Sequence, residues 1–411
     1  MATVSLVALL LVACGCSVQP TATPTAARRA PARSTDPTTT STTSAPPTTA
    51  PPSATPTTVP APVVQTPGWS GALTTLPPGG GFTSLSCISD TFCVATGGGT
   101  SGDTSSLTAG SGVAVSWDGA TWSDPSVYFP GPASGPVTAP ILPAISCTSG
   151  PTCVIVDGSD HLSYGDGTNW SAPSAMALGP SLTVNPQDPG PGHPGSRAAA
   201  VACPVSTFCA VVDNTGHAFA LRNGSWAPTQ SFGLPGSRGT TVSLYQPGRI
   251  GVACPTGASC TAVVGATVLD WDGSTWAQES APWTSSPTSG PSDPTALACP
   301  SATTCIIANG SSVSVRSAGS GWSPEETIDT RGGLDSISCP SASYCLAADT
   351  GGSVVAWNGT SWSAPRQVIP AAAEYPGLGT SVSCASPQFC MVMNGDGDYA
   401  TYSGGASGPT P

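Results

Sequence analysis

The 411-residue sequence contains no lysine, so its ten basic residues are all arginines. Only 8% of the residues are charged, and from Gly68 onward seven arginines stand against 21 acidic residues, a net charge of about −14. Nucleic acids and anionic membrane surfaces attract proteins through a basic footprint, which this composition lacks. We therefore expect no nucleic-acid partner.

An apolar run long enough to cross a bilayer is also missing at the start of the chain. Val4 to Ala13 is about ten residues long, too short for a helix that spans a hydrocarbon core of about 30 Å. The run is typical of the hydrophobic region of a signal peptide. It ends in Leu11-Val12-Ala13-Cys14, which resembles the bacterial lipobox, where the cysteine is acylated. The resemblance implies a signal and anchor region over residues 1–16, lipidation of Cys14, and a location at the outer, extracytoplasmic side of the cell membrane. Simple removal of the signal peptide is the alternative.

Large apolar residues are almost absent from residues 17–67, which consist mostly of Pro, Thr, Ser and Ala. Such a segment cannot bury enough surface to offset the entropy lost on ordering. We expect a disordered stalk, extended at about 3.1 Å per residue where it adopts polyproline II. The stalk leaves 68–405 as the folded domain and 406–411 as a disordered tail.

Cysteine is abundant, and fourteen cysteines form pairs with five intervening residues. The first cysteines of successive pairs are 40 to 60 residues apart, in the range of β-propeller repeats. The pairs are Cys87 and Cys93, Cys147 and Cys153, Cys203 and Cys209, Cys254 and Cys260, Cys299 and Cys305, Cys339 and Cys345, and Cys384 and Cys390.

Within each repeat, the first cysteine ends one predicted strand and the second opens the next. Cross-strand neighbours have Cβ atoms about 4.5–5.5 Å apart, near what a disulfide needs. We therefore predict a disulfide within each repeat, formed in an oxidising compartment. Zinc is the rival reading, but the spacing is not C-x2-C and no pair has a histidine placed to complete a site. We predict no metal and no cofactor.

Residues 335–365 show what one repeat builds. Four short β-type runs are joined by turns rich in Gly, Pro and Ser, which predicts a four-stranded antiparallel meander. A tryptophan opens the predicted fourth strand in six repeats, and Trp69, before the first cysteine pair, supplies the seventh. We predict an all-β, seven-bladed β-propeller of four-stranded antiparallel blades, closed by an N-terminal strand that completes the last blade.

The turns between the third and fourth strands carry a repeated pattern. They read Trp117-Asp118-Gly119-Ala120-Thr121-Trp122, Trp271-Asp272-Gly273-Ser274-Thr275-Trp276 and Trp357-Asn358-Gly359-Thr360-Ser361-Trp362. This pattern resembles a shortened Asp-box of sialidase-like propellers. With the cysteine pairs, the repeat resembles secreted and lipid-anchored propellers of actinobacterial type. The resemblance implies a fold rather than an activity, because Asp-box turns are structural in those families.

The meander places the cysteine turns and the Asp-Gly turns on one face, and the longer connections on the opposite face. Binding residues gather on variable loops over a rigid scaffold, so the second face is the candidate binding face. Its candidate residues are Tyr128, Phe129, His193, Arg197, Arg238, Tyr245, Arg249, Trp283 and Arg331. The alternative is that the aromatic residues only pack the loops onto the blades.

Three functions remain open. The leading hypothesis is a non-enzymatic binding or sensor module, expected to be a monomer, for a cell-wall glycan or an extracellular protein. A sialidase-like glycoside hydrolase is the second, although the chain has only four glutamates and no recognised arginine motif. A structural cell-surface protein without a small ligand is the third. Asn394 to Asp398 has the alternating carboxylates of a calcium loop but lacks the distal glutamate, so turn chemistry is the favoured reading there.

Overall fold

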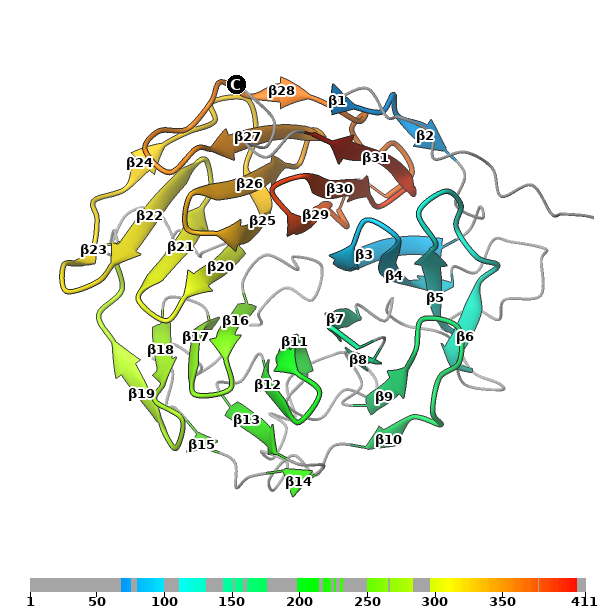
Figure 1. Ribbon diagram of the computed structural model, residues 1–411, viewed down its shortest axis with the longest axis horizontal. Coiled ribbons are helices and arrows are strands. Elements are labelled where there is room, and N and C mark those ends of the chain that lie inside the picture. The colour runs from blue at the N-terminus through cyan, green and yellow to red at the C-terminus, as the bar shows by residue number, and fades with distance from the viewer. Residues whose placement is uncertain are drawn as a thin grey trace, which may run out of the picture. The chain divides into compact units, whose positions relative to one another are not determined.

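Seven antiparallel sheets stand around a common axis in the computed structural model of the chain (Figure 1). The described residues contain no helix that is long and apolar enough to cross a membrane. Cys14, predicted to be lipidated, and the segments predicted to be a stalk and a tail lie outside the described part. The structure describes residues 68–74, 80–99, 111–130, 143–150, 152–157, 161–175, 198–213, 217–222, 225–226, 230–231, 250–264, 267–283, 296–375 and 377–404.

The sheets are the predicted blades, numbered here by their cysteine pairs. Blade 1 contains β3 (Gly80–Ser89), β4 (Phe92–Gly99), β5 (Gly112–Trp117) and β6 (Ser126–Phe129). Blade 2 contains β7 (Ala144–Thr148), β8 (Thr152–Val156), β9 (His161–Gly165) and β10 (Ser174–Ala175). Blade 3 contains β11 (Ala198–Val205), β12 (Phe208–Asp213), β13 (His217–Arg222), β14 (Ser225–Trp226) and β15 (Gln230–Ser231).

The remaining blades repeat this order from the axis outward. Blade 4 contains β16 (Ile250–Thr256), β17 (Ser259–Val264), β18 (Thr267–Trp271) and β19 (Trp276–Glu279). Blade 5 contains β20 (Ala296–Ser301), β21 (Thr304–Asn309), β22 (Ser312–Ser317), β23 (Gly321–Trp322) and β24 (Glu326–Thr327). Blade 6 contains β25 (Leu334–Ser341), β26 (Tyr344–Asp349), β27 (Ser353–Trp357) and β28 (Arg366–Gln367). Blade 7 contains β29 (Thr380–Ser386), β30 (Phe389–Asn394), β31 (Asp398–Ser403), β1 (Gly68–Trp69) and β2 (Leu73–Thr74).

The N-terminal strand closes the ring, as predicted. Trp69 pairs with Tyr402 in the register of β1 and β31, and β2 continues along the same strand through Leu73 and Tyr399. The rings of Trp69 and Tyr402 lie 5.6 Å apart. Closure gives the last blade its outer strand, so β31 is not left as an open edge.

The outermost strand differs from the prediction. In blades 1, 2 and 6 the tryptophan forms only an isolated bridge, and a separate short strand follows. In these three blades a serine follows the tryptophan, and its hydroxyl accepts a hydrogen bond from the backbone of the third strand. In blade 6, for example, the Ala356 N–H donates to Ser363 Oγ at 2.9 Å, and that hydroxyl donates to Ala364 O at 3.0 Å. Blade 4 has Ala277 at this position, and its outer strand pairs without interruption.

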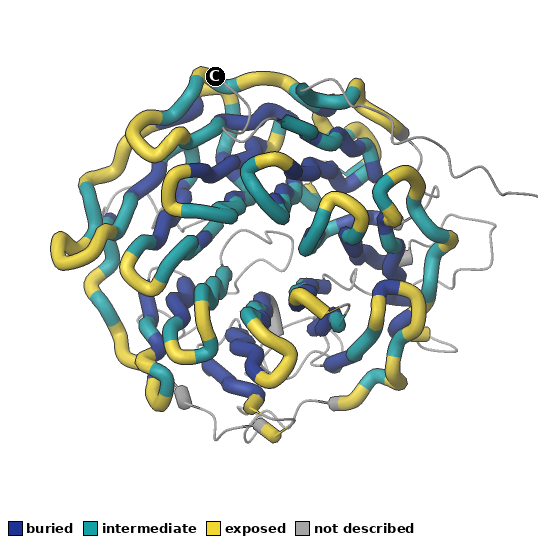
Figure 2. Tube along the Cα trace, in the orientation of Figure 1, coloured by how far each residue is buried: buried dark blue, intermediate teal, exposed yellow. Residues whose placement is uncertain are grey.

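The core lies between blades rather than within them. Each of seven buried apolar clusters joins residues of two neighbouring blades, such as Trp117 of blade 1 with Tyr399 of blade 7. The second strands β12, β26 and β30 are buried at every position, because both of their faces are covered. Figure 2 shows the buried segments in the middle of the blades and the exposed ones at the turns and the outer rim.

Serine hydroxyls link the innermost strands of four neighbouring blade pairs. The serine before the first cysteine accepts a hydrogen bond from the cysteine N–H of the next blade, at 2.9–3.0 Å. The pairs run from Ser338 to Cys384, Ser383 to Cys87, Ser86 to Cys147 and Ser146 to Cys203. An innermost strand has no further strand to pair with, so these hydroxyls satisfy N–H groups at its open edge.

Candidate functional site

Disulfides close one face of the propeller. All seven predicted pairs are bonded within their own repeat, and in blades 1, 2 and 7 the two cysteines are direct cross-strand partners. The Asp-Gly turns lie against the cysteine turns. The Trp117 indole N–H donates to Asp90 O at 3.1 Å, and a Cβ added to Gly119 would meet Thr91. The two sets of turns therefore share a face, as predicted.

The Asp-Gly turns are fixed by their own carboxylates. Asp118 Oδ1 accepts from the N–H groups of Ala120 and Thr121 at 2.9 and 2.7 Å, and Asp272 makes the same bonds. Backbone donors that favour the ionised form lower the pKa of Asp118 and bring that of Asp272 to about 2. The carboxylate oxygens of Asp118 and Asp272 accept hydrogen bonds from residues of their own turns. These aspartates are therefore structural.

The opposite face is built from the strand 2–3 turns and the connections between blades. Asp349 ends β26, and its Oδ1 accepts from the Ser353 N–H at 2.7 Å. Asp396, in the turn of blade 7, accepts from three successive N–H groups of the incoming connection, those of Ala373, Glu374 and Tyr375. Asn394 accepts from two N–H groups of its own turn. Asp396 and Asn394 of the possible calcium loop therefore hold the backbone in place, and Asp398 accepts from the Asn394 amide.

Two aromatic candidates are buried. Tyr128 lies in β6, not in a connection, and is 3% exposed against Trp170 of blade 2. Trp283 is 7% exposed in the cluster between blades 4 and 5. Phe129 is partly buried, and its ring lies 5.1 Å from that of His161. Strand alternation explains the burial of Tyr128, because its neighbour Val127 takes the outward position. Tyr128 and Trp283 therefore pack blades together and do not offer a ring face to a ligand.

Arg331 is the one basic candidate that the described residues include. It is 45% exposed, and its Nε lies 3.7 Å from Oδ1 of the buried Asp329. The other candidates lie outside the described residues, and their part in a site stays a prediction: His193, Arg197, Arg238, Tyr245 and Arg249.

Three aspartates that the sequence did not single out lie near Arg331. Asp329 and Asp349 are buried, and Asp335 Oδ2 accepts from the Thr380 N–H of blade 7 at 3.0 Å. Burial raises the pKa of Asp335 to about 6, with a further contribution from the negative charge of Asp349. A weak sequence signal existed, because Asp213 and Asp349 each end a second strand and Asp157 directly follows one. Within the described residues, no group of three or more His, Cys, Asp or Glu is arranged to hold a metal ion.

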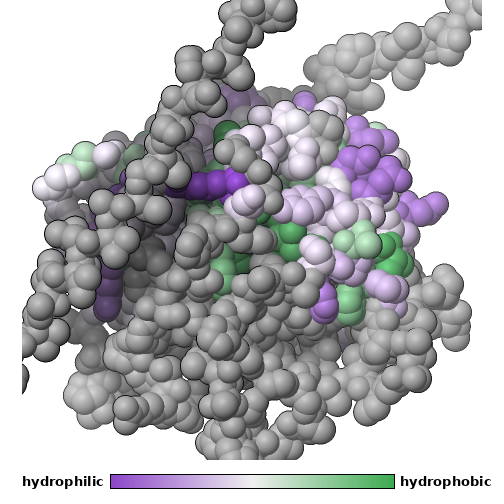
Figure 3. Space-filling view, turned by 90° about the horizontal axis from the view of Figure 1, so that it is seen from below, coloured by the Kyte–Doolittle hydropathy of each residue, from purple (hydrophilic) through white to green (hydrophobic). Residues whose placement is uncertain are grey.

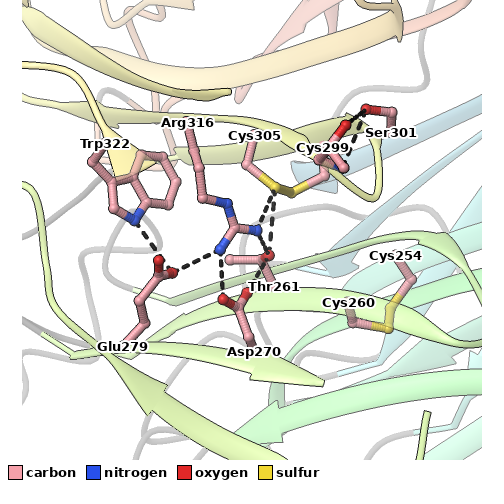
Figure 4. Close-up of a disulfide and its surroundings, with 11 residues drawn as sticks. Cys254, Cys260, Thr261, Asp270, Glu279, Cys299, Ser301, Cys305, Arg316 and Trp322 are labelled. Atoms are coloured by element: carbon pink, nitrogen blue, oxygen red, sulfur yellow. Dashed lines mark hydrogen bonds and ion pairs between the residues drawn. A yellow bond between two sulfur atoms is a disulfide. The ribbon is translucent and has the colours of Figure 1, made fainter. Parts of the chain in front are cut away.

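Other charged residues meet inside the wall between blades 4 and 5. Arg316 faces the second cysteine of its blade, where blades 1, 4 and 6 have a tryptophan, and its guanidinium reaches into blade 4 (Figure 4). It bonds Asp270 at 2.5 Å, Glu279 at 2.7 Å and Thr261 at 2.6 Å. Burial raises the pKa of Asp270, but the bonds from Arg316 and Thr261 lower it by more, so the net direction is downward. For Glu279, burial and the nearby Asp270 raise the pKa.

These contacts bear on the hydrolase hypothesis. Glu279 binds Arg316, and Glu325 accepts from the Asn309 amide at 2.6 Å. Arg222 lies over Trp271 of blade 4 at 5.0 Å and donates to Gly273 O. These side chains therefore tie blades and turns together.

The surface between the two faces is a mixture of residue types. In the view from below, polar and weakly polar residues cover most of the coloured area, with separate smaller apolar patches (Figure 3). The exposed large apolar residues, Leu73, Val127 and Val205, come from three different blades. They do not form one apolar docking surface.

The sequence matches no protein-family model and no curated protein. Solved structures match over most of the chain. "YCF48 bound to D1 peptide" is 13% identical, with a TM-score of 0.52, and covers 84% of this chain and 99% of its own. "Crystal structure of RRP9 WD40 repeats" is 11% identical, with a TM-score of 0.54 and coverages of 82% and 99%. Selenomethionine-substituted virginiamycin B lyase from Staphylococcus aureus is 8% identical, with a TM-score of 0.54 and the same coverages. At these identities the likeness concerns the fold alone: the chain is similar to known propellers of different functions.

Proposed function

We propose that the chain is a non-enzymatic binding module, held at the extracytoplasmic side of the cell membrane by a lipid on Cys14. The propeller would bind a protein, or a cell-wall glycan, through the face opposite the disulfides. The lipobox-like Leu11-Val12-Ala13-Cys14 and the seven disulfides support the location, because disulfides persist in oxidising compartments.

The difference between the two faces carries the proposal. The disulfide face repeats one pair of short turns, whose polar atoms bond to each other and to the neighbouring backbone. The opposite face has connections of different lengths and composition, and it holds Arg331 partly exposed beside a group of aspartates. Loops of this kind on a rigid scaffold are where binding residues concentrate.

A protein partner is the form of the proposal to test first. YCF48, a propeller of the same fold, has been seen with the D1 peptide, and WD40 repeats share the fold as well. These similarities support a role in binding partners without identifying one. A glycan remains the alternative ligand.

The test compares the two faces in one binding assay. Full-length protein is incubated with extracellular and cell-wall fractions, and the retained molecules are identified by mass spectrometry and on a glycan array. Arg331→Ala, on the loop-rich face, should weaken retention. Asp90→Ala, in an exposed cysteine turn, is the matched control and should leave retention unchanged. The reverse pattern would refute the choice of face, and turnover of fluorogenic glycosides by the wild-type protein would favour the hydrolase.

The location has its own test. Cys14→Ser removes the acylated thiol, so the variant should move from the membrane fraction to the soluble fraction or the medium. Cys16→Ser is the matched control, because it keeps the lipobox-like residues. An unchanged distribution of the Cys14 variant would argue against the lipid anchor.

A further inference from the structure

Two buried carboxyl groups meet where blade 5 connects to blade 6. Asp329 follows β24 in this connection, its N–H donates to Ser311 O at 3.2 Å, and its Oδ1 accepts from the Arg331 N–H at 2.8 Å. Asp349 ends β26, and its side chain lies against the same connection, since a Cβ added to Gly332 would be 3.7 Å from the Asp349 Cγ. The two groups therefore come from opposite sides of one joint between blades.

Neither carboxyl group is solvated. The Asp329 side chain is 0% exposed, and its Oδ2 is buried with no hydrogen-bond donor in the described part of the chain. Asp349 is 2% exposed, with its Oδ1 bonded to the Ser353 N–H. A buried carboxylate oxygen without a donor is costly, because nothing replaces the water it has lost.

Two ionised carboxylates cannot donate hydrogen bonds to each other, and their charges repel strongly away from water. One proton resolves both difficulties, because O–H···O⁻ is a short, strong bond that spreads a single charge over both groups. Carboxyl pairs in such contact titrate as a unit.

The other charged groups here offset only part of the negative charge. On the blade 5 side, Arg331 Nε lies 3.7 Å from Asp329 Oδ1, and Glu325 is bonded to the Asn309 amide. On the blade 6 side, Asp335 adds a third carboxyl group. Blade 7 contributes a backbone donor, the Thr380 N–H, which binds Asp335.

We propose that Asp329 and Asp349 share one proton, which makes the joint between blades 5 and 6 sensitive to pH: it is held tightly in acid and loosens as pH rises. Because the joint lies on the loop-rich face, its state sets how firmly the connection carrying Arg331 is held. Loss of the proton leaves two negative charges in contact and drives Asp329 toward solvent.

The pKa directions agree with this arrangement. Burial raises the pKa of Asp349, and the nearby Asp329 raises it further, although the Ser353 N–H acts in the opposite sense. A carboxyl group whose pKa is raised on folding adds stability at low pH, and this contribution is lost as pH rises through the folded-state pKa. Stability of the joint should therefore fall with rising pH above about 4, the ordinary range for aspartate.

Asp329→Asn tests the shared proton in the full-length protein. The asparagine amide can donate to the Asp349 carboxylate at every pH, as the proton does only in acid. Urea unfolding between pH 4 and pH 8 should show a smaller change of the unfolding equilibrium constant with pH in the variant than in the wild type. The variant should be the more stable protein at pH 8. Asp124→Asn, at an exposed site, should keep the wild-type pH dependence.

A second measurement covers the case in which the variant does not fold. Hydrogen exchange of the wild type, corrected for the intrinsic effect of pH, should accelerate over residues 325–353 as pH rises, while residues 380–403 stay protected. Unchanged protection across the pH range would overturn the proposal, as would an Asp329 variant with the full wild-type pH dependence. Stabilisation of the wild type at pH 7 by calcium chloride, lost in Asp329→Asn, would also overturn it, because a cation would then bridge the two carboxylates.

Discussion

The joints between blades fall into two groups. From blade 6 through blades 7, 1 and 2 to blade 3, a serine hydroxyl binds the cysteine N–H of the following blade. Blades 3, 4 and 5 have alanine at the same position, and no hydroxyl reaches the next inner strand from there. The alanines are Ala202, Ala253 and Ala298.

Each joint without the serine has a contact of its own. Arg222 lies over Trp271 between blades 3 and 4, Arg316 binds Asp270 and Glu279 between blades 4 and 5, and Asp329 meets Asp349 between blades 5 and 6. Each serine joint has the same modest hydrogen bond, and the joint between blades 6 and 7 also holds the carboxyl group of Asp335. The contacts at the alanine joints all involve charged groups. Mutations of these charged groups should therefore have larger effects than mutations of the joint serines, and pH should act where a buried carboxyl group is present.

The largest effect is expected at Arg316. Breaking a fully buried ion pair costs about 3–5 kcal/mol, and partial exposure of Asp270 and Glu279 lowers the expected loss for Arg316→Met to about 2–3 kcal/mol. Two neighbouring carboxylates would then lose their shared cation. The free energy of unfolding from urea titration measures the loss. Arg222→Met is the control, because an exposed cation–π contact contributes about 0.5–1 kcal/mol. Equal losses at the two arginines would contradict the assignment.

The next effect concerns pH and the joint between blades 6 and 7. Folding raises the pKa of Asp335 from 3.8 to about 6, so the folded state binds the proton more tightly and stability falls as pH rises between these values. Asp335→Asn should remove this loss while the amide oxygen still accepts from the Thr380 N–H. We expect the variant to gain about 2 kcal/mol over the wild type at pH 7 and little at pH 4, measured by urea unfolding. A variant equally destabilised at both pH values would show that the carboxyl group has another role.

A smaller effect is expected at a serine joint. Ser383→Ala leaves the Cys87 N–H without its partner, which should cost about 1 kcal/mol, nearly independent of pH and salt. Thermal or urea unfolding measures the change, and Ser301→Ala, in an exposed turn, should cost less. A loss at Ser383 as large as that at Arg316 would remove the distinction between the two groups of joints.

The features that could be predicted from the sequence are those whose signals lie within a single repeat or at a chain end. Cysteine spacing, turn residues and the tryptophan count indicated seven blades, their disulfides and the closing strand, because each signal lies within one repeat or at the chain end it completes. The joints could not be predicted in the same way. Arg316 and Asp270 are 46 residues apart, and only the alignment of neighbouring blades brings them together.

The candidate site shows the same limit. Tyr128 and Trp283 were predicted in connections, but packing between blades buries both. To predict that Asp329 lies near Asp349, one would have to know the path of the connection between blades 5 and 6. No local sequence pattern encodes that path. Conversely, the Trp-Ser dipeptide was visible in the sequence, and the hydrogen bonds of its hydroxyl to backbone groups could have been inferred from it.

The most delicate test converts one group of joints into the other. Ala253→Ser places a hydroxyl at the position from which Ser86, Ser146, Ser338 and Ser383 reach the next blade, so it should accept from the Cys299 N–H. A hydrogen bond to an open strand edge should add about 0.5–1 kcal/mol, less the cost of desolvating the hydroxyl. Urea unfolding measures the gain, and Ala277→Ser in the outer strand is the control. Stabilisation at Ala253 would show that the edge N–H groups are what the serine positions serve. If Ala253→Ser gives no gain in stability while Ser383→Ala gives a loss, the inner strands at the alanine joints are spaced differently from those at the serine joints. The charged contacts would then replace the serine hydrogen bonds at these joints rather than add to them.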